Sequence, residues 1–338
     1  MARIGPMGVA WICGVWTPQI QATPAAAGRA VITVRDLAVP AGRHGGDGAR
    51  LAAALGMPPD QVLDLSASLN PVAPDSTPIL ASHLGAIGRY PDPEAATAAL
   101  ADAIGVTPDR LLLTNGGSEA IALVAAELGP GWVDEPDFSL YRRHLPGLDR
   151  AGLRWRSNPH NPSGRLAPAG DEAGVWDEAF WPLATGTWTR GDADRGAVVL
   201  GSLTKLLACP GLRVGYVLGA PELITRLARR QPQWAVNGLA CAALPDLLAT
   251  VDLAAWSHET GRLRRRLAAV LRDHGLAPGP SEANWVLVED AALRRQLAGH
   301  GILVRDCASF GLPSMVRIAV PDESRLERLE EALHQCRG

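Results

Sequence analysis

Short apolar segments alternate with longer Ala- and Leu-rich segments along most of this chain, and this alternation limits the folds that it can adopt. Short apolar runs are typical of buried strands, whereas longer periodic runs are typical of helices. The predicted strands are 110–113, 197–200, 212–218, 285–288, 302–304 and 316–320. The predicted helices are 49–55, 93–104, 118–128, 222–230, 254–274, 291–300 and 323–335. This order predicts an α/β fold with a mainly parallel sheet, and 338 residues are enough for two domains.

One basic residue stands apart from the others. The chain contains 32 Lys and Arg residues, and Lys205 is its only lysine. Arginine stays protonated in proteins, whereas a lysine amine can lose its proton and attack a carbonyl carbon. A single lysine could also survive by chance, so the sequence around it decides between the two interpretations.

Charge and cysteine content exclude several classes of protein. The formal net charge of −3 favours neither nucleic acid nor an anionic membrane as a partner. Five cysteines without a CxxC pair favour neither a disulfide framework nor a zinc site, so no metal is expected and a reducing cytoplasm fits best. The apolar run 8–16 is too short to span a membrane, and although it resembles a weak signal peptide, a flexible tail or an early start codon is favoured.

Two segments could bind or position a ligand. The strand–Gly-Gly–helix junction at 113–120 places backbone N–H groups at a helix N-terminus, which suits a phosphate. A hydrolase nucleophile elbow would need glycine where Ala120 stands, which disfavours Ser118 as a nucleophile. The turn N-P-H-N-P-S-G at 158–164 is rigid and polar, although taken alone it would be an ordinary surface turn.

The order of the motifs carries more information than any one of them. The turn 158–164, then D-E-A-F at 177–180, then S-L-T-K at 202–205 with Arg213 eight residues after Lys205, resembles the class I/II aminotransferase superfamily. The resemblance runs from about His44 to the C-terminus. It implies pyridoxal 5'-phosphate (PLP) as the cofactor and the PLP-dependent transferase fold of type I, with a large domain on a mainly parallel, seven-stranded type of sheet and a small α+β domain.

The resemblance also implies domain boundaries. Residues 1–43 would be a flexible N-terminal extension, 44–235 the large PLP-binding domain and 236–338 the small domain, with 44–72 contributing to the small domain and the substrate pocket. Segments 142–157 and 165–176 are shorter than in relatives, which place a helix and a strand in the second of them. We therefore expect a trimmed sheet or shortened connections.

Matching positions imply roles for cofactor-binding residues. Lys205 would bond covalently to PLP and later transfer protons, while Asp177 would keep the pyridine nitrogen protonated. Asn161 would donate to the phenolic oxygen, and Phe138 would stack on the ring, with Tyr141 close by unless it is only a core residue. The residues expected at the cofactor phosphate are Gly117, Ser118, Ser202 and Arg213. Tyr90 resembles a tyrosine that reaches the phosphate in the neighbouring subunit, which implies a homodimer with shared active sites.

Two branches of the superfamily compete for the substrate. H-G-G at 44–46 and the segments 63–71, 233–237 and 302–307 resemble threonine-phosphate decarboxylase of cobalamin biosynthesis, whereas histidinol-phosphate aminotransferase shares the core motifs but fits H-G-G and R-x-C less well. The first branch implies decarboxylation of L-threonine O-3-phosphate to (R)-1-amino-2-propanol O-2-phosphate. A catalytically silent PLP-binding or sensor protein is a third alternative, which the retained Asp–Asn–Lys–Arg set disfavours.

The substrate pocket is inferred from the same matches. Arg317 would bind the substrate carboxylate as a bidentate pair, and Asn70 and Arg305 would line the same pocket. His44 is a candidate for the substrate phosphate, although His44 and Arg305 could equally be core or surface residues. Ser68 stands where the decarboxylase has an asparagine, which is a departure from the pattern.

Overall fold

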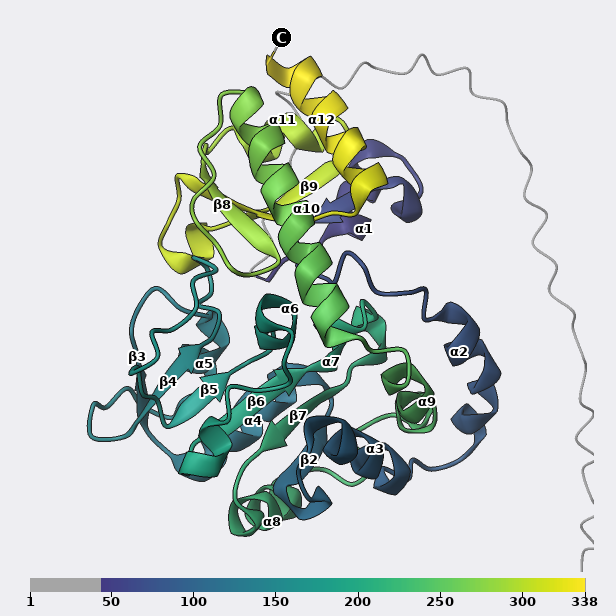
Figure 1. The fold of residues 1–338 in the computed structure, drawn as a ribbon, viewed down its shortest axis with the longest axis vertical. Helices are drawn as coiled ribbons and strands as arrows, with labels where there is room; N and C mark the ends of the chain where they lie inside the picture. Colours follow the sequence, from purple (N-terminus) through teal and green to yellow (C-terminus); the bar gives the residue numbers. More distant parts are fainter. Residues whose placement is uncertain (1–43, 338) are drawn as a thin grey trace, which may run out of the picture. The chain divides into compact units, whose positions relative to one another are not determined.

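The computed structural model of the chain describes residues 44–337, and the expectations for 1–43 lie outside that range. The described residues form a mixed α/β fold built on two sheets, as the alternating pattern predicts (Figure 1). One sheet has six strands and the other has four.

The six-stranded sheet has the order β2-β7-β6-β5-β4-β3. Strands β3 to β6 run parallel, and β7 is antiparallel to both of its neighbours. Six strands rather than seven agree with the expectation of a trimmed sheet. The strands are β2 (Leu111–Thr114), β3 (Gly131–Val133), β4 (Leu153–Ser157), β5 (Val175–Asp177), β6 (Val198–Ser202) and β7 (Gly215–Leu218).

Both faces of this sheet are buried, which is why its central strands are apolar throughout. On β6, Val199 packs into one core, whereas Val198 and Leu200 pack into the core on the opposite face. The first core includes residues of α3 (Glu94–Ile104), α6 (Trp181–Thr185), α7 (Leu203–Leu206) and α9 (Gly238–Leu248). The second core includes residues of α4 (Gly116–Leu128), α5 (Ser139–His144) and α8 (Pro221–Arg230).

The four-stranded sheet joins distant parts of the sequence. Its order is β1-β9-β10-β8, in which β1 (Leu63–Leu65) pairs in parallel with β9 (Ile302–Asp306). The other strands, β8 (Trp285–Glu289) and β10 (Met315–Ala319), pair antiparallel. Its core is shared with α10 (Leu253–Asp273), α11 (Leu293–Ala298) and α12 (Glu323–Arg337), while α1 (Gly48–Leu55) packs on a smaller cluster with Leu303 and Ala298.

Several element predictions need correction. The strand predicted at 212–218 begins only at Gly215, because residues 210–212 form a 3-10 turn and Arg213 has a left-handed φ of 58°. Helix α4 begins at Gly116, two residues before the predicted start. Helix α9 escaped prediction because Pro245 interrupts its pattern, although Asn237 caps its first turn through Ala240 N. The other unpredicted elements are β1, β3, β4, β5, α2 (Thr77–Ser82), α5, α6 and α7.

Between residues 44 and 337, no single helix is both long and apolar enough to cross a membrane. Helices α9 and α10 meet the length and composition test only as a pair, and they are bent by 88° relative to each other.

Arg190 secures the short connection between β4 and β5, which contains neither a helix nor a strand between residues 158 and 174. Its Nη2 donates to the carbonyl oxygens of Pro168, Ala169 and Asp171, and its guanidinium lies 4.8 Å from the centre of the Trp176 ring. Hydrogen bonds from one cation therefore fix a segment that has no secondary structure of its own.

We expect Arg190→Ala to lower the free energy of unfolding by about 2–3 kcal/mol, because several charge-assisted hydrogen bonds are lost together. Asp192 forms ion pairs with both Arg190 and Arg195. Arg195→Ala is therefore the matched control, because Arg195 is largely exposed and its loss should cost less than about 1 kcal/mol. Chemical denaturation of the two variants makes the comparison, and equal losses would contradict the role given to Arg190.

Candidate active site

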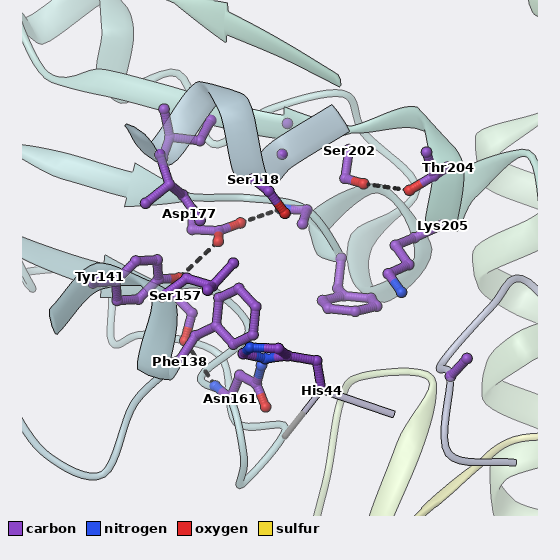
Figure 2. Close-up of a pocket in the computed structure, with 18 of the residues that line it drawn as sticks. His44, Ser118, Phe138, Tyr141, Ser157, Asn161, Asp177, Ser202, Thr204 and Lys205 are labelled. Carbon is purple, nitrogen blue, oxygen red and sulfur yellow. Dashed lines mark hydrogen bonds between the residues drawn. The ribbon is translucent and has the colours of Figure 1, made fainter. Parts of the chain in front are cut away.

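A cavity of about 510 Å³ opens beside the carboxyl ends of β5 and β6. This is the edge of a parallel sheet at which α/β proteins commonly bind ligands. All predicted site residues except Asn70 and Tyr90 line the cavity, and Figure 2 shows part of the lining. These are His44, Gly117, Ser118, Phe138, Tyr141, Asn161, Asp177, Ser202, Lys205, Arg213, Arg305 and Arg317.

Lys205 lies on the short helix α7, directly after β6. Burial, and then the positive charges of Arg317, Arg213 and Arg305, lower the pKa of its amine to about 8. A lysine in this environment reaches its neutral, nucleophilic form much closer to neutral pH than an exposed lysine does. The only lysine of the chain therefore lies where burial and nearby positive charges lower the pKa of its amine.

Asp177 ends β5 on the opposite side of the cavity. Its carboxylate accepts a hydrogen bond from the Tyr141 hydroxyl at 2.7 Å (Figure 2), and a second from Ala179 N at 3.0 Å. Burial raises the pKa of this carboxyl group. Within residues 44–337 it forms no ion pair with a basic side chain, so a cationic group in the cavity would stabilise its ionised form.

Arg317 and Asn161 meet inside the cavity although Arg317 lies on the four-stranded sheet and Asn161 lies in the turn after β4 of the six-stranded sheet. Arg317, on β10, donates from Nη1 to Asn161 Oδ1 at 2.6 Å, and its guanidinium lies 4.7 Å from the centre of the Trp285 ring. Its Nε is buried without a hydrogen-bond partner in the described structure. Burial lowers the pKa of Arg317, but a guanidinium remains charged at neutral pH, so the site suits an anion.

The turn that presents Asn161 is fixed on both sides. Ser157 Oγ accepts from Asn161 N at 2.7 Å and donates to the Asp137 carboxylate, and burial raises the pKa of Asp137 to about 7. His160 lies between Pro136 O and Ser163 Oγ, at 2.7 Å from each. The backbone around Asn161 is therefore held in place before any ligand binds.

The other end of the cavity suits a phosphate. Helix α4 begins at Gly116, so the backbone of Gly117 and Ser118 forms its first turn beside Arg213. A Cβ atom on Gly116 would come within 2.4 Å of Arg213 Nη2, which shows how closely the guanidinium approaches this helix end. Unpaired N–H groups, the helix dipole and the guanidinium all favour an anion here.

Two candidates for substrate binding meet near the start of the described chain. The His44 ring contacts Phe138 edge-on, with ring centroids 5.9 Å apart. Arg305 is buried on β9, and a Cβ atom on Gly45 would lie 3.3 Å from its Nη1. The structure thus brings His44 and Arg305 to the same part of the cavity.

Asn70 differs from its predicted place, because it is absent from the cavity lining. Its amide donates to Leu206 O at 2.9 Å and accepts from Val72 N at 3.0 Å, so its side chain is used to join this segment to α7. Tyr90 also lies away from the lining, 77% exposed and stacked on Trp234 at 4.4 Å. The Ser68 hydroxyl is buried without a hydrogen-bond partner in the described structure.

Comparison with known proteins decides the family. The family model described as aminotransferase class I and II matches residues 155–333, more than half of the chain. Threonine-phosphate decarboxylase of Salmonella typhimurium is 32% identical, over 86% of this chain and 95% of that protein. The chain belongs to the class I and II aminotransferase family. Histidinol-phosphate aminotransferase 1 of Dechloromonas aromatica is 28% identical, over 84% of this chain and 93% of that protein.

Solved structures agree with this family. L-threonine-O-3-phosphate decarboxylase from Porphyromonas gingivalis superposes with a TM-score of 0.68 at 25% identity, covering 81% of this chain and 99% of that chain. Histidinol-phosphate aminotransferase from Sinorhizobium meliloti, solved with pyridoxal-5'-phosphate, shares the fold with a TM-score of 0.74 at 19% identity, covering 92% and 98%. The predictions of a fold type I enzyme and of a PLP-dependent family are confirmed.

The side chains of this aminotransferase-family cavity fit pyridoxal phosphate chemically. A lysine with a lowered pKa can bond to an aldehyde, a buried carboxylate can hold a ring N–H, and a helix N-terminus beside Arg213 can hold a phosphate.

Sequence reasoning missed three residues around the family motifs. Asp137 and Ser157 support the Asn161 turn, and the buried Trp285 contacts Arg317. A carboxylate directly before Phe138 was the visible signal for Asp137. The signal for Trp285 was weak, because a tryptophan that begins a strand is usually a core residue.

In the cofactor-free protein we expect Lys205→Met to be more stable than wild type at pH 7. Below pH 8 both the folded and the unfolded wild type are protonated at Lys205, so folding buries a charge among arginines. Between pH 8 and about 10.5 the unfolded state binds more protons, so wild-type stability rises and the difference between the proteins shrinks. Melting temperatures of wild type and Lys205→Met across this pH range test the direction of the change, with Lys205→Arg as the charge-retaining control. A stability difference that does not vary with pH would contradict this prediction.

Proposed function

We propose that this protein decarboxylates L-threonine O-3-phosphate to (R)-1-amino-2-propanol O-2-phosphate in cobalamin biosynthesis, with pyridoxal phosphate as its cofactor. One observation carries the choice of a doubly anionic substrate: Arg317 and Arg305 lie directly opposite each other on β10 and β9. Two like charges in this position destabilise a sheet. A carboxylate and a phosphate on one substrate would neutralise both.

The cofactor roles proposed for the cavity follow its geometry. Lys205 would carry the cofactor, Asp177 would hold its ring nitrogen, Asn161 would donate to its phenolic oxygen, and Phe138 would stack on its ring with Tyr141 close by. Gly117, Ser118, Ser202 and Arg213 hold its phosphate. When bound, the cofactor supplies an electron sink for the pair of electrons released at the substrate Cα.

The remaining residues would orient the substrate and move one proton. Arg317 would bind the carboxylate, while Arg305 and His44 would hold the distal phosphate, so the substrate would be held at both ends with its Cα–carboxylate bond in a fixed orientation. That bond breaks, CO₂ leaves, and the Lys205 ammonium delivers a proton to Cα in its place. The lowered pKa of Lys205 suits it to both proton transfer and attachment of the cofactor.

Amino transfer from histidinol phosphate is the second candidate, supported by the Dechloromonas relative. Histidinol phosphate has a phosphate but no carboxylate, so that reaction would use Arg317 only with a second, carboxylate-bearing substrate. The threonine phosphate reaction uses both arginines at once. A silent PLP-binding protein is the third candidate, and the pocket that combines Lys205 with Asp177 favours an enzyme over it.

We also propose a cytoplasmic homodimer with shared active sites. Four apolar side chains are exposed close together in sequence or by contact: Leu84, Ile87, Tyr90 and Trp234. Aromatic and aliphatic groups in such a patch are typical of an interface. A second copy that covers this patch would bring Tyr90 to the cofactor phosphate of its partner.

Reconstitution tests the proposed reaction. We expect wild-type protein with pyridoxal phosphate to show a visible absorption band and to release CO₂ from L-threonine O-3-phosphate. Lys205→Ala and the charge-retaining Lys205→Arg should lose the band, and turnover should fall by about a thousandfold or more. A band without CO₂, but with amino transfer to or from histidinol phosphate, would replace the decarboxylase by the aminotransferase.

Mixed dimers test the shared site. Lys205→Ala and Tyr90→Ala subunits carrying different tags are co-expressed, and the mixed dimer is purified. If Tyr90 acts in its partner's site, one site has both residues intact, and we expect about half of the wild-type activity per dimer. If Tyr90 acts within its own subunit, or not at all, the mixed dimer shows no more activity than the two parent dimers average.

A further inference from the structure

Trp285, the first residue of β8, contacts three parts of the cavity wall and has no role in the chemistry proposed above. Its side chain is 0% exposed. Its indole Nε1 donates to Pro162 O at 2.8 Å, its ring lies 4.7 Å from the Arg317 guanidinium, and its edge meets Phe180 with centroids 4.7 Å apart. One rigid group therefore contacts the Asn161 turn, the carboxylate-binding arginine and the segment after Asp177.

The contact with Arg317 follows from strand register. Arg317 is opposite Leu287 on β8, so Trp285 is its diagonal neighbour on the same face. The guanidinium is held from two directions, by the aromatic face of Trp285 and by Asn161 Oδ1 at 2.6 Å. A cation packed on an aromatic face keeps its charge in a buried site and loses freedom to change rotamer.

The contact with Pro162 joins the two sheets beside Asn161. Gly164 O accepts from Glu282 N at 2.8 Å and from Ala283 N at 3.1 Å, so the chain just before Trp285 binds the far end of the same turn. A Cβ atom on Gly164 would come within 2.1 Å of Ser281 Oγ. The two segments are thus in direct contact, and the indole N–H ties the turn at the residue next to Asn161.

We propose that Trp285 is a positioning residue that fixes the separation between Arg317 and Asn161, and so aligns the substrate carboxylate with the cofactor. The inference rests on the roles given to those two residues under the proposed function. Any aromatic ring could supply the face under Arg317, but only an indole N–H also bonds to Pro162 O, because phenylalanine has no donor and leaves a buried carbonyl without a partner.

The test compares Trp285→Phe with Trp256→Phe. Trp256 is also buried, but it lies on α10 in a core that shares no residue with the cavity lining. Its variant therefore controls for the loss of indole volume. Two quantities are measured on the holoenzyme: KM and kcat for L-threonine O-3-phosphate, and the pH midpoint of the visible cofactor band without substrate.

For Trp285→Phe we expect KM to rise about tenfold with kcat changed by no more than about threefold, because one buried hydrogen bond is worth about this factor. The midpoint of the band should rise measurably, by about one pH unit, since a displaced Asn161 donates less well to the phenolic oxygen and so favours its protonated state. Trp285→Leu, which also lacks the aromatic face, should raise KM further. Trp256→Phe should lower the melting temperature while leaving KM and midpoint at wild-type values.

Wild-type KM and midpoint in Trp285→Phe, or equal changes in Trp256→Phe, would overturn the positioning role. If wild type does not turn over L-threonine O-3-phosphate, the proposed function fails. The substrate-free midpoint still separates the two tryptophan variants in that case, so the two failures can be told apart.

Discussion

The organisation of this protein depends on buried positive charge around one lysine. Lys205 shares its cavity with Arg213, Arg305 and Arg317, and Arg305 faces Arg317 across adjacent strands. Such an arrangement is unfavourable in an empty, desolvated pocket, and it becomes favourable when anions enter. Burial lowers the pKa of the Lys205 amine, and the same arginine charges that cost folding free energy lower it further, so these charges favour both an anion in the cavity and a neutral lysine amine.

Two sheets are needed to assemble these charges. The six-stranded sheet supplies Asp177 and Ser202 at the ends of its strands and Lys205 just beyond, whereas the four-stranded sheet supplies Arg305 and Arg317. Buried hydrogen bonds that join the two parts include Arg317 to Asn161, Trp285 to Pro162, and Asn70 to Leu206. Each of these bonds ends at, or next to, a residue of the cavity or of α7. Positioning of the ligand and cohesion of the fold are therefore achieved by the same contacts.

The connection between β4 and β5 has no helix or strand of its own, yet it leaves this arrangement intact. Hydrogen bonds from Arg190 hold the carbonyls of the 168–171 segment, and Asp171 is bound by Arg154 and Arg156. Because the trimmed segment lies beyond the ends of the strands, β5 still places Asp177 in parallel register beside β4 and β6. The loop between β4 and β5 can be compact because hydrogen bonds from charged side chains satisfy its backbone carbonyl groups.

The sequence by itself determined the fold class, the single lysine and twelve of the residues that line the cavity, because hydrophobic period and ordered motifs are local in the chain. Tertiary structure alone decided which of them meet. It removed Asn70 from the lining, placed Arg305 opposite Arg317, and brought Trp285 and Asp137 to the Asn161 turn. Helix α9 and the short strands β3 to β5 were also found only from the tertiary structure. Pro245 interrupts the helical pattern of α9, and the short strands give little periodic signal in the sequence. Contacts between residues more than a hundred positions apart depend on packing and register, which no local pattern encodes.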